Sequence, residues 1–239
     1  MTTSGIRVGT KGAAVAVALL LLAGCGSSGS KGAAPTTAAN PARDKAAAQK
    51  LVLALADMPT GWIAAKHSTD PSDAAENKKL AACVGATDPS VATANVDGPD
   101  LDHDTTEIQS SVTVMDTRAH FLTDAKALQS SKFVSCAETI FKADLPKSLA
   151  KNSPGVVVSN IKVAPATFAK VGEVTAAFRV SLTLTGSGRT LPLYLDEVEF
   201  GSNRSEVSIT FLGQSAPVAS ALEQATMSKA AAKLAKSAA

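Results

Sequence analysis

The 239-residue sequence contains little of several residue types, and each shortage excludes a class of function. Aromatic residues make up 4% of the chain, with one Trp and one Tyr, which leaves little material for surfaces that stack on nucleic-acid bases. A formal net charge of +2 lacks the basic field of a nucleic-acid-binding protein. Three Cys and three His do not suit a zinc scaffold. The hydrophobic fraction of 45% is high enough to bury a core, so the chain is not disordered throughout.

The first 24 residues are predicted to be a lipoprotein signal peptide. Arg7 and Lys11 precede an uninterrupted apolar run of 11 residues at 13–23. This run has the length of a signal-peptide core, and a membrane span takes about 20 residues. It ends in LAGC at residues 22–25, which resembles the lipobox of bacterial lipoproteins. The resemblance implies cleavage before Cys25, a diacylglycerol on its thiol and acylation with palmitate. The alternative is an ordinary secretory signal with a chance Cys.

A lipid anchor at Cys25 is expected to hold the protein on the extracytoplasmic face of the cell membrane, because two or three acyl chains bind stably. Without Arg7 and Lys11 the chain has 21 basic and 21 acidic residues, so no attraction to anionic headgroups remains. Residues 25–42 are rich in Gly, Ser, Ala, Thr and Pro, which predicts a flexible tether after the lipidated Cys. Thr36 and Thr37 are candidate sites for O-linked sugars.

Residues 43–239 are predicted to form a single α+β extracytoplasmic domain. Helical patterns cover residues 43–57, 71–83, 118–128, 132–150 and 219–236. Strand patterns cover residues 107–115, 156–163, 175–185, 191–200 and 206–211. Glycine-rich turns join several strands, which favours an antiparallel sheet of about five strands with helices covering one face. Residues 84–106 are predicted to be a turn-rich loop, and the register of the 191–200 strand predicts a bulge near Asp196.

Cys83 and Cys136 remain once Cys25 is assigned to the lipid. Two thiols outside the cytoplasm are expected to form one disulfide, which closes a loop of about 54 residues. Two buried free thiols are an alternative, and a redox pair is another, although the spacing is not CxxC.

The most polar stretch of the chain is an acidic run centred on three aspartates. Asp100, Asp102 and Asp104 place carboxylates at alternate positions, as calcium loops do. An EF-hand loop that begins at Asp100 needs Gly and Glu where the sequence has Thr105 and Ser111, so that match fails. A looser calcium site and a solvated loop stay open as interpretations. No metal site is predicted, and the three aspartates are candidate binding residues.

Trp62 follows a predicted helix end and is either a core anchor or part of a binding groove. His67, His103 and His120 lack metal-ligand spacing to one another. Neither a Gly-x-Ser-x-Gly elbow nor a phosphate-binding glycine loop is present. The sequence therefore favours a non-catalytic protein without a cofactor, and an envelope hydrolase is the least favoured alternative.

The predicted mature chain resembles the alanine-rich lipoproteins of actinobacteria, including mycobacterial ones. The features that carry this resemblance are LAGC at 22–25, the tether, LADMPTGW at 55–62, and the pair Cys83 and Cys136 before a strand-rich half. The layout is similar to the extracellular sensor domain of mycobacterial Ser/Thr kinases and to PsbP-like lipoproteins. Those domains pair an antiparallel sheet with flanking helices around a cleft and carry no known catalytic residues. The kinase sensor domains hold two disulfides, whereas this chain can form one.

Together these features predict a membrane-anchored cell-envelope lipoprotein that acts as a ligand-binding or sensor module. Its expected partners are the membrane, through the N-terminal anchor, and a lipid, a glycan or an envelope protein, but not nucleic acid. A concave sheet face under helices is a suitable place for an apolar ligand. The alternative is a structural or partner-binding envelope lipoprotein without a small-molecule ligand.

Overall fold

The computed structural model describes residues 39–67 and 71–237 of the chain. The predicted signal peptide, the lipidation site Cys25 and most of the tether, with Thr36 and Thr37, lie outside the described residues. Within the described ranges, no helix combines the length and the apolar character needed to cross a membrane.

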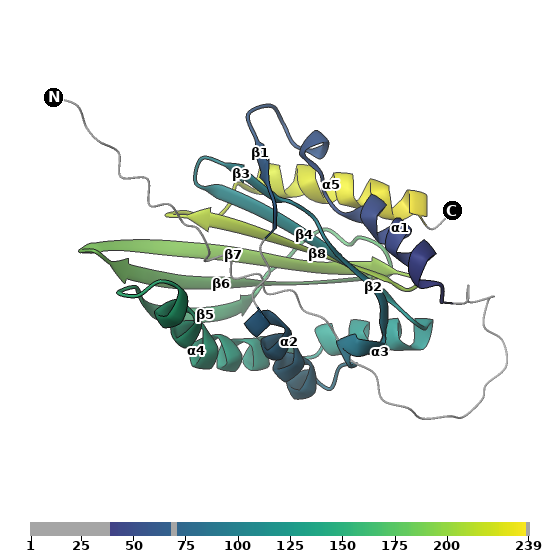
Figure 1. Ribbon diagram of the computed structural model, residues 1–239, viewed down its shortest axis with the longest axis horizontal. Helices are drawn as coiled ribbons and strands as arrows, with labels where there is room; N and C mark the ends of the chain where they lie inside the picture. The colour runs from purple at the N-terminus through teal and green to yellow at the C-terminus, as the bar shows by residue number, and fades with distance from the viewer. Residues whose placement is uncertain (1–38, 68–70, 238–239) are drawn as a thin grey trace.

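An antiparallel sheet of eight strands forms the centre of the fold (Figure 1). The strands are β1 (Ile63–Ala65), β2 (Ala92–Asp97), β3 (Asp100–His103), β4 (Thr106–Met115), β5 (Val157–Pro165), β6 (Val174–Gly186), β7 (Arg189–Ser202) and β8 (Ser205–Gln214). Their order is β1-β3-β4-β8-β7-β6-β5, and β2 pairs with the end of β4 that β3 leaves free. The antiparallel α+β class is confirmed. The described strands number eight rather than about five, because residues 63–65 and 92–103 supply three further strands.

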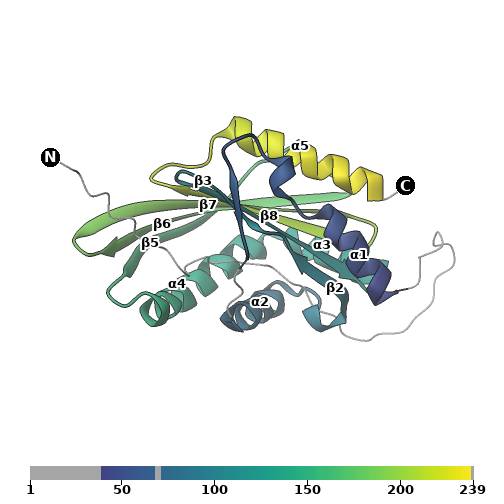
Figure 2. The same cartoon turned by 45° about the horizontal axis from the view of Figure 1, so that its top comes forward.

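Helices cover both faces of the sheet, rather than the one face expected (Figure 2). The helices are α1 (Pro41–Leu51), α2 (Pro71–Val84), α3 (Arg118–Leu128), α4 (Lys132–Asn152) and α5 (Ser220–Ser237), with short 3-10 turns η1 (Leu55–Asp57) and η2 (Pro89–Val91). In Figure 2, α5 lies above the sheet, and α2 and α4 lie below it. Helix α1 shares an apolar core with α5, and α3 shares one with α2 and α4. The central strands need cover on both sides, because every residue from Leu195 to Gly201 in β7 is buried.

Each face of the sheet has its own apolar core. On the α1/α5 face, Leu51 and Met227 pack with Val198 and Phe211. On the α2–α4 face, the core includes Phe133, whose ring meets that of Phe178 edge-on at 5.2 Å, together with Phe141, Leu145 and Leu195. The disulfide between Cys83 of α2 and Cys136 of α4 lies in this second layer, with 5.9 Å between the two Cα atoms.

The four-strand meander β5–β8 follows the prediction closely, with one correction in β7. Ser187 and Gly188 both have positive φ angles, as a tight hairpin turn requires. The predicted bulge near Asp196 is wrong, because β7 pairs with β6 and with β8 without a register shift. Side chains of β7 alternate between the two faces of the sheet along the whole strand. Leucines occupy one of these faces early in the strand, and Glu197 and Glu199 occupy the same face later in it.

Two further segments differ from the prediction. The predicted helix over 43–57 ends at Leu51, and the chain then runs extended so that Leu53 is buried and its backbone N–H donates to Ser110 Oγ at 2.9 Å. The predicted loop at 84–106 contains β2 and β3, which pair with the two halves of β4. Polar composition hid these strands, because only one of their faces meets an apolar core.

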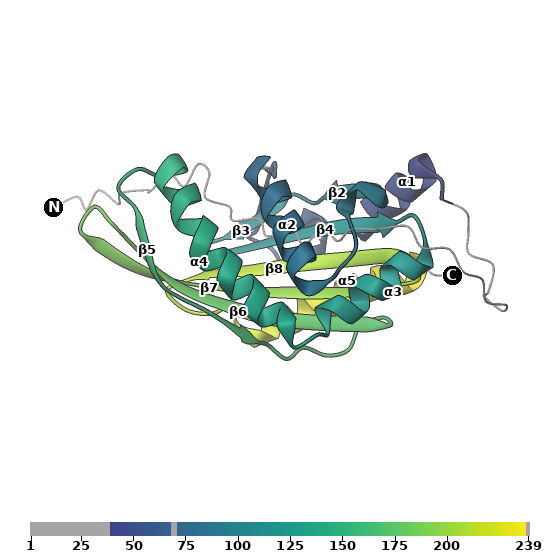
Figure 3. The ribbon, with the colours of Figure 1, turned by 90° about the horizontal axis from the view of Figure 1, so that it is seen from below.

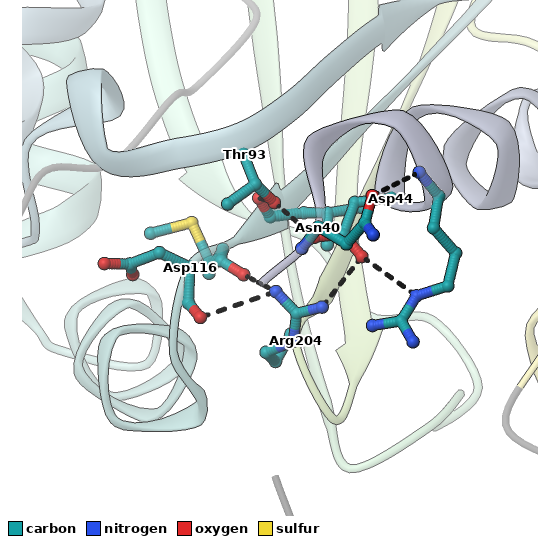
Figure 4. Close-up of polar contacts among 8 residues, drawn as sticks. Asn40, Asp44, Thr93, Asp116 and Arg204 are labelled. Atoms are coloured by element: carbon teal, nitrogen blue, oxygen red, sulfur yellow. Dashed lines mark hydrogen bonds and ion pairs between the residues drawn. The ribbon is translucent and has the colours of Figure 1, made fainter. Parts of the chain in front are cut away.

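A buried ion pair fixes α1 to the far end of the chain (Figure 4). Arg204, in the turn between β7 and β8, donates from Nη2 to Asp44 Oδ1 at 2.8 Å and from Nη1 to the carbonyl of Met115. Thr93 Oγ1 donates to the other oxygen of Asp44 at 2.7 Å. Asp44 and Arg204 are 3% and 5% exposed. Although burial opposes ionisation of Asp44, its hydrogen bonds with Arg204 and Thr93 hold its pKa below the usual value.

Candidate ligand-binding site

A cavity lies between α4 and the sheet, on the face that Figure 3 shows from below. Helix α4 packs against β5 and α2, and the cavity opens beside it over the middle strands. The cavity has a volume of about 40 Å³, counted as the space that the centres of water molecules can occupy. At 10–15 Å³ for each water, this volume takes about three water molecules. The cavity therefore suits the end of an apolar chain or one compact group.

The lining of the cavity divides into an apolar wall and a polar end. The apolar wall consists of Phe141, Leu145, Val180, Leu182, Leu193, Leu195 and Leu212. The polar end consists of Glu107 and Gln109 from β4 and Thr210 from β8. Strand register produces this division, because Gln109 lies opposite Thr210 while Glu107 lies opposite Leu212. A lining that joins apolar surface to a few convergent polar groups is typical of small-molecule sites.

Three carboxylates gather at the polar end. Glu107 lies directly across from Asp102 of β3, and Asp100 lies two residues further along the same face. Burial raises the pKa of Glu107, and the charges of Asp100 and Asp102 raise it further, while a hydrogen bond from Gln109 lowers it. Burial and the charge of Asp100 also raise the pKa of Asp102. His67 Nδ1 lies 2.6 Å from Asp100 Oδ1, so one of the three carboxylates already has a partner.

Behind the polar end lies a second group of carboxyls, which the sequence analysis missed. Thr210 Oγ1 donates to Glu197 at 2.6 Å, and Ser208 donates to the other oxygen of the same side chain. Glu199 and Glu206 follow on the same face of the sheet, and Asp124 of α3 approaches Glu206. Three of these carboxyls lie on one face of the sheet and the fourth lies on α3, and each of the four is at most 8% exposed. We call this set, Asp124, Glu197, Glu199 and Glu206, the buried acid row.

Burial raises the pKa of every carboxyl in the acid row. It raises the pKa of Glu197 to about 7 and that of Asp124 to about 6, and it raises the pKa values of Glu199 and Glu206 well above their usual range. One oxygen in each of Asp124, Glu199 and Glu206 has no hydrogen-bond partner among the described residues. A neutral carboxyl tolerates this environment better than an ion does, because an unpaired buried charge is far costlier than an unpaired polar group.

The sequence contained a signal for the acid row. Leu191, Leu193 and Leu195 occupy alternate positions of the β7 strand, and Glu197 and Glu199 continue the same alternation. Keeping period two through the strand places both acids on the buried face, whereas the predicted bulge moved them to solvent. The bulge was predicted because Val198 and Phe200 are out of phase with the three leucines, and the observed register has no such shift.

The predicted binding residues fall into separate places. Asp100 and Asp102 lie beside Glu107 at the polar end of the cavity. Asp104 lies in the turn between β3 and β4, with 84% of its side chain exposed and a φ of 52°. Trp62 is buried in the core of the α1/α5 face, where its ring stacks on that of His103 at 5.5 Å between centroids. Within residues 39–67 and 71–237, no group of three His, Cys, Asp or Glu side chains is arranged to hold a metal ion.

The acid row makes the folded protein less stable as the pH rises. Because folding raises these pKa values, the folded state binds more protons than the unfolded state between about pH 4.5 and 7. Each raised group lowers the free energy of unfolding by about 1.4 kcal/mol per pH unit in its window. We therefore expect the urea midpoint to fall between pH 5 and pH 8, and Glu197→Gln to recover about 2 kcal/mol of that loss.

The matched control is Glu138→Gln on α4, whose carboxylate pairs with Lys142 at 2.8 Å on the outer side of the helix. This variant should keep the wild-type slope of stability against pH. A wild-type midpoint that rises from pH 5 to pH 8 would show that the acid row is ionised in the folded protein.

The solved structures that are similar to this chain include two from Mycobacterium tuberculosis. No model of a protein family matches the chain, and no curated protein matches it either. The extracellular domain of PknH from Mycobacterium tuberculosis is similar with 12% identity and a TM-score of 0.38, over 80% of this chain and 96% of that one. LpqN, a protein involved in cell envelope biogenesis of Mycobacterium tuberculosis, is similar with 15% identity and a TM-score of 0.30, over 75% and 78% of the two chains.

Proposed function

We propose that this chain is a non-catalytic, membrane-anchored module of the cell envelope that binds a small ligand in the cavity beside α4. The observation that carries the proposal is the cavity itself, with seven apolar side chains along one wall and three polar side chains at one end. The wall suits an apolar group, and the polar end suits a head that forms hydrogen bonds. A cavity of this size takes part of a ligand, so a longer molecule extends out of it.

Two features support a place outside the cytoplasm. The disulfide between Cys83 and Cys136 suits an oxidising compartment, because cytoplasmic thiols are kept reduced. The LAGC sequence at 22–25 supports a lipid anchor on Cys25. Labelled palmitate should therefore enter the full chain in a bacterium that processes lipoproteins, and Cys25→Ser should abolish that labelling. Labelling that survives in this variant would contradict the anchor.

Filling the cavity is expected to weaken ligand binding. Leu193→Phe enlarges a side chain of the apolar wall, so we expect the affinity for 1-octanol, measured by titration calorimetry, to fall about tenfold or more. Leu55→Phe makes the same change at a side chain that is 44% exposed on η1, and it should leave the affinity unchanged.

Two results would count against the cavity. The first is an absence of saturable binding of 1-octanol by the wild-type protein. The second is an equal loss of affinity in both Phe variants. If octanol does not bind while chemical crosslinking captures an envelope protein on the intact chain, the structural or partner-binding alternative replaces the proposal.

A further inference from the structure

We propose that the ligand of this cavity carries a primary ammonium group attached directly to an apolar chain. This inference rests on the proposed function and names the chemical class of the ligand. It follows from the hydrogen-bond roles of the three polar side chains that line the cavity, and from the charges beside them.

The polar end offers mainly acceptors. The hydroxyl proton of Thr210 is directed to Glu197, so its oxygen has only lone pairs left to offer. Gln109 uses an amide hydrogen on Glu107, which leaves its carbonyl oxygen as an acceptor. Glu107 contributes carboxylate oxygens. A head that only donates fits this end best, and an ammonium has three N–H donors and no acceptor.

The local charge favours the same head. The charged groups that act on Glu107 are Asp100, Asp102 and His67, and the His67 ring lies against Asp100. Three carboxylates and one imidazole therefore lie close together, and a positively charged head group compensates the excess of negative charge. A carboxylate head would meet both acceptors and like charges, and a hydroxyl head would supply only one donor.

The apolar wall indicates what the remainder of the ligand is, beyond its head group. Leu193, Leu195 and Leu212 form part of this wall, and Leu212 lies directly across from Glu107 in the sheet. The carboxylate and the apolar surface therefore lie on neighbouring strands, which are about 5 Å apart. An ammonium bonded directly to an alkyl chain fits this spacing, because its charged and apolar parts are adjacent. A phosphate between the amine and the chain, as in a phospholipid head, would place a negative charge beside the acids.

The test compares three ligands that share one eight-carbon chain and differ in their heads. We expect calorimetry at pH 7.5 to give octylamine an affinity about tenfold higher than that of 1-octanol, because charge-assisted hydrogen bonds are the stronger kind. Octanoate should bind more weakly than 1-octanol. Leu193→Phe should weaken octylamine binding as well, which locates the amine in the same cavity.

Glu107→Gln provides the sharpest variant, because it removes the charge and keeps the shape. We expect it to reduce the preference for octylamine over 1-octanol from about tenfold to about twofold or less. Glu138→Gln, on the outer side of α4, should keep the full preference.

The possible results separate this inference from the proposed function. If 1-octanol or octanoate binds as tightly as octylamine, the amine inference is wrong and the cavity proposal stands. If Glu107→Gln keeps the tenfold preference, the amine is held elsewhere and the inference is also wrong. If none of the three ligands binds, the cavity proposal fails, and the amine inference fails with it.

Discussion

Replacing Cys83 with Ser is expected to lower the free energy of unfolding by about 2–5 kcal/mol. The bond to Cys136 spans 53 residues of sequence, so it removes many conformations from the unfolded chain. The chain-entropy relation gives roughly 4 kcal/mol for a loop of that length. The new hydroxyl lies at an exposed position, whereas the Cys136 thiol that loses its partner is 5% exposed within the core below the sheet.

Urea unfolding of the oxidised wild type, the reduced wild type and the double Cys→Ser variant measures this effect. The reduced wild type and the double variant should agree to within about 1 kcal/mol, because both lack the same bond. A loss smaller than about 1 kcal/mol on reduction would mean that helix packing, and not the crosslink, holds α2 to α4.

Arg204→Met is expected to lower the free energy of unfolding by about 3–5 kcal/mol. The substitution keeps an unbranched side chain but leaves Asp44 buried and without its cationic partner. It also frees the carbonyl of Met115, which accepts from Arg204 in the native structure. The loss should shrink as the pH falls below 4, because protonating Asp44 removes the unpaired charge.

A second substitution, at Asp44, tests whether its unpaired charge causes the loss of stability. Asp44→Asn combined with Arg204→Met removes both charges, so the double variant should be more stable than Arg204→Met alone. If the double variant is instead the less stable of the two, the charge on Asp44 is not the source of the loss. Chemical denaturation of the wild type, Asp44→Asn, Arg204→Met and the double variant at pH 7 gives the coupling free energy directly.

The sequence predicted those parts of the fold in which local pattern and tertiary environment agree. Strands β5–β8 show period-two patterns, and the turn between β6 and β7 contains Ser187 and Gly188, so period and turn chemistry both indicated this part of the fold. Helices α2 and α3 likewise lie within two residues of their predicted bounds. In each case the residues that define the element also bury its apolar side.

The parts that were missed depend on neighbours distant in sequence. Strand β3 carries Asp100 and Asp102, and only its pairing with β1 and β4 makes that acidic run a strand. Glu199 is buried close to Glu197 and Glu206, and no local pattern around β7 reveals this burial. The candidate site follows the same rule, since Asp100 and Asp102 were predicted to be binding residues and Glu107 was not.

The strand order has a consequence for how the chain folds during and after synthesis. Strand β8 lies between β4 and β7, so the partner of β4 is made about 90 residues after β4 itself. Until Ser205–Gln214 has emerged, the early strands have an open edge of unpaired backbone groups. The last pieces then close the layer formed by α1 and α5, because α5 packs on α1 and Arg204 reaches Asp44 across 160 positions. A chain truncated before β8 therefore has two separate parts of the sheet with unpaired edge strands, and we expect it to aggregate.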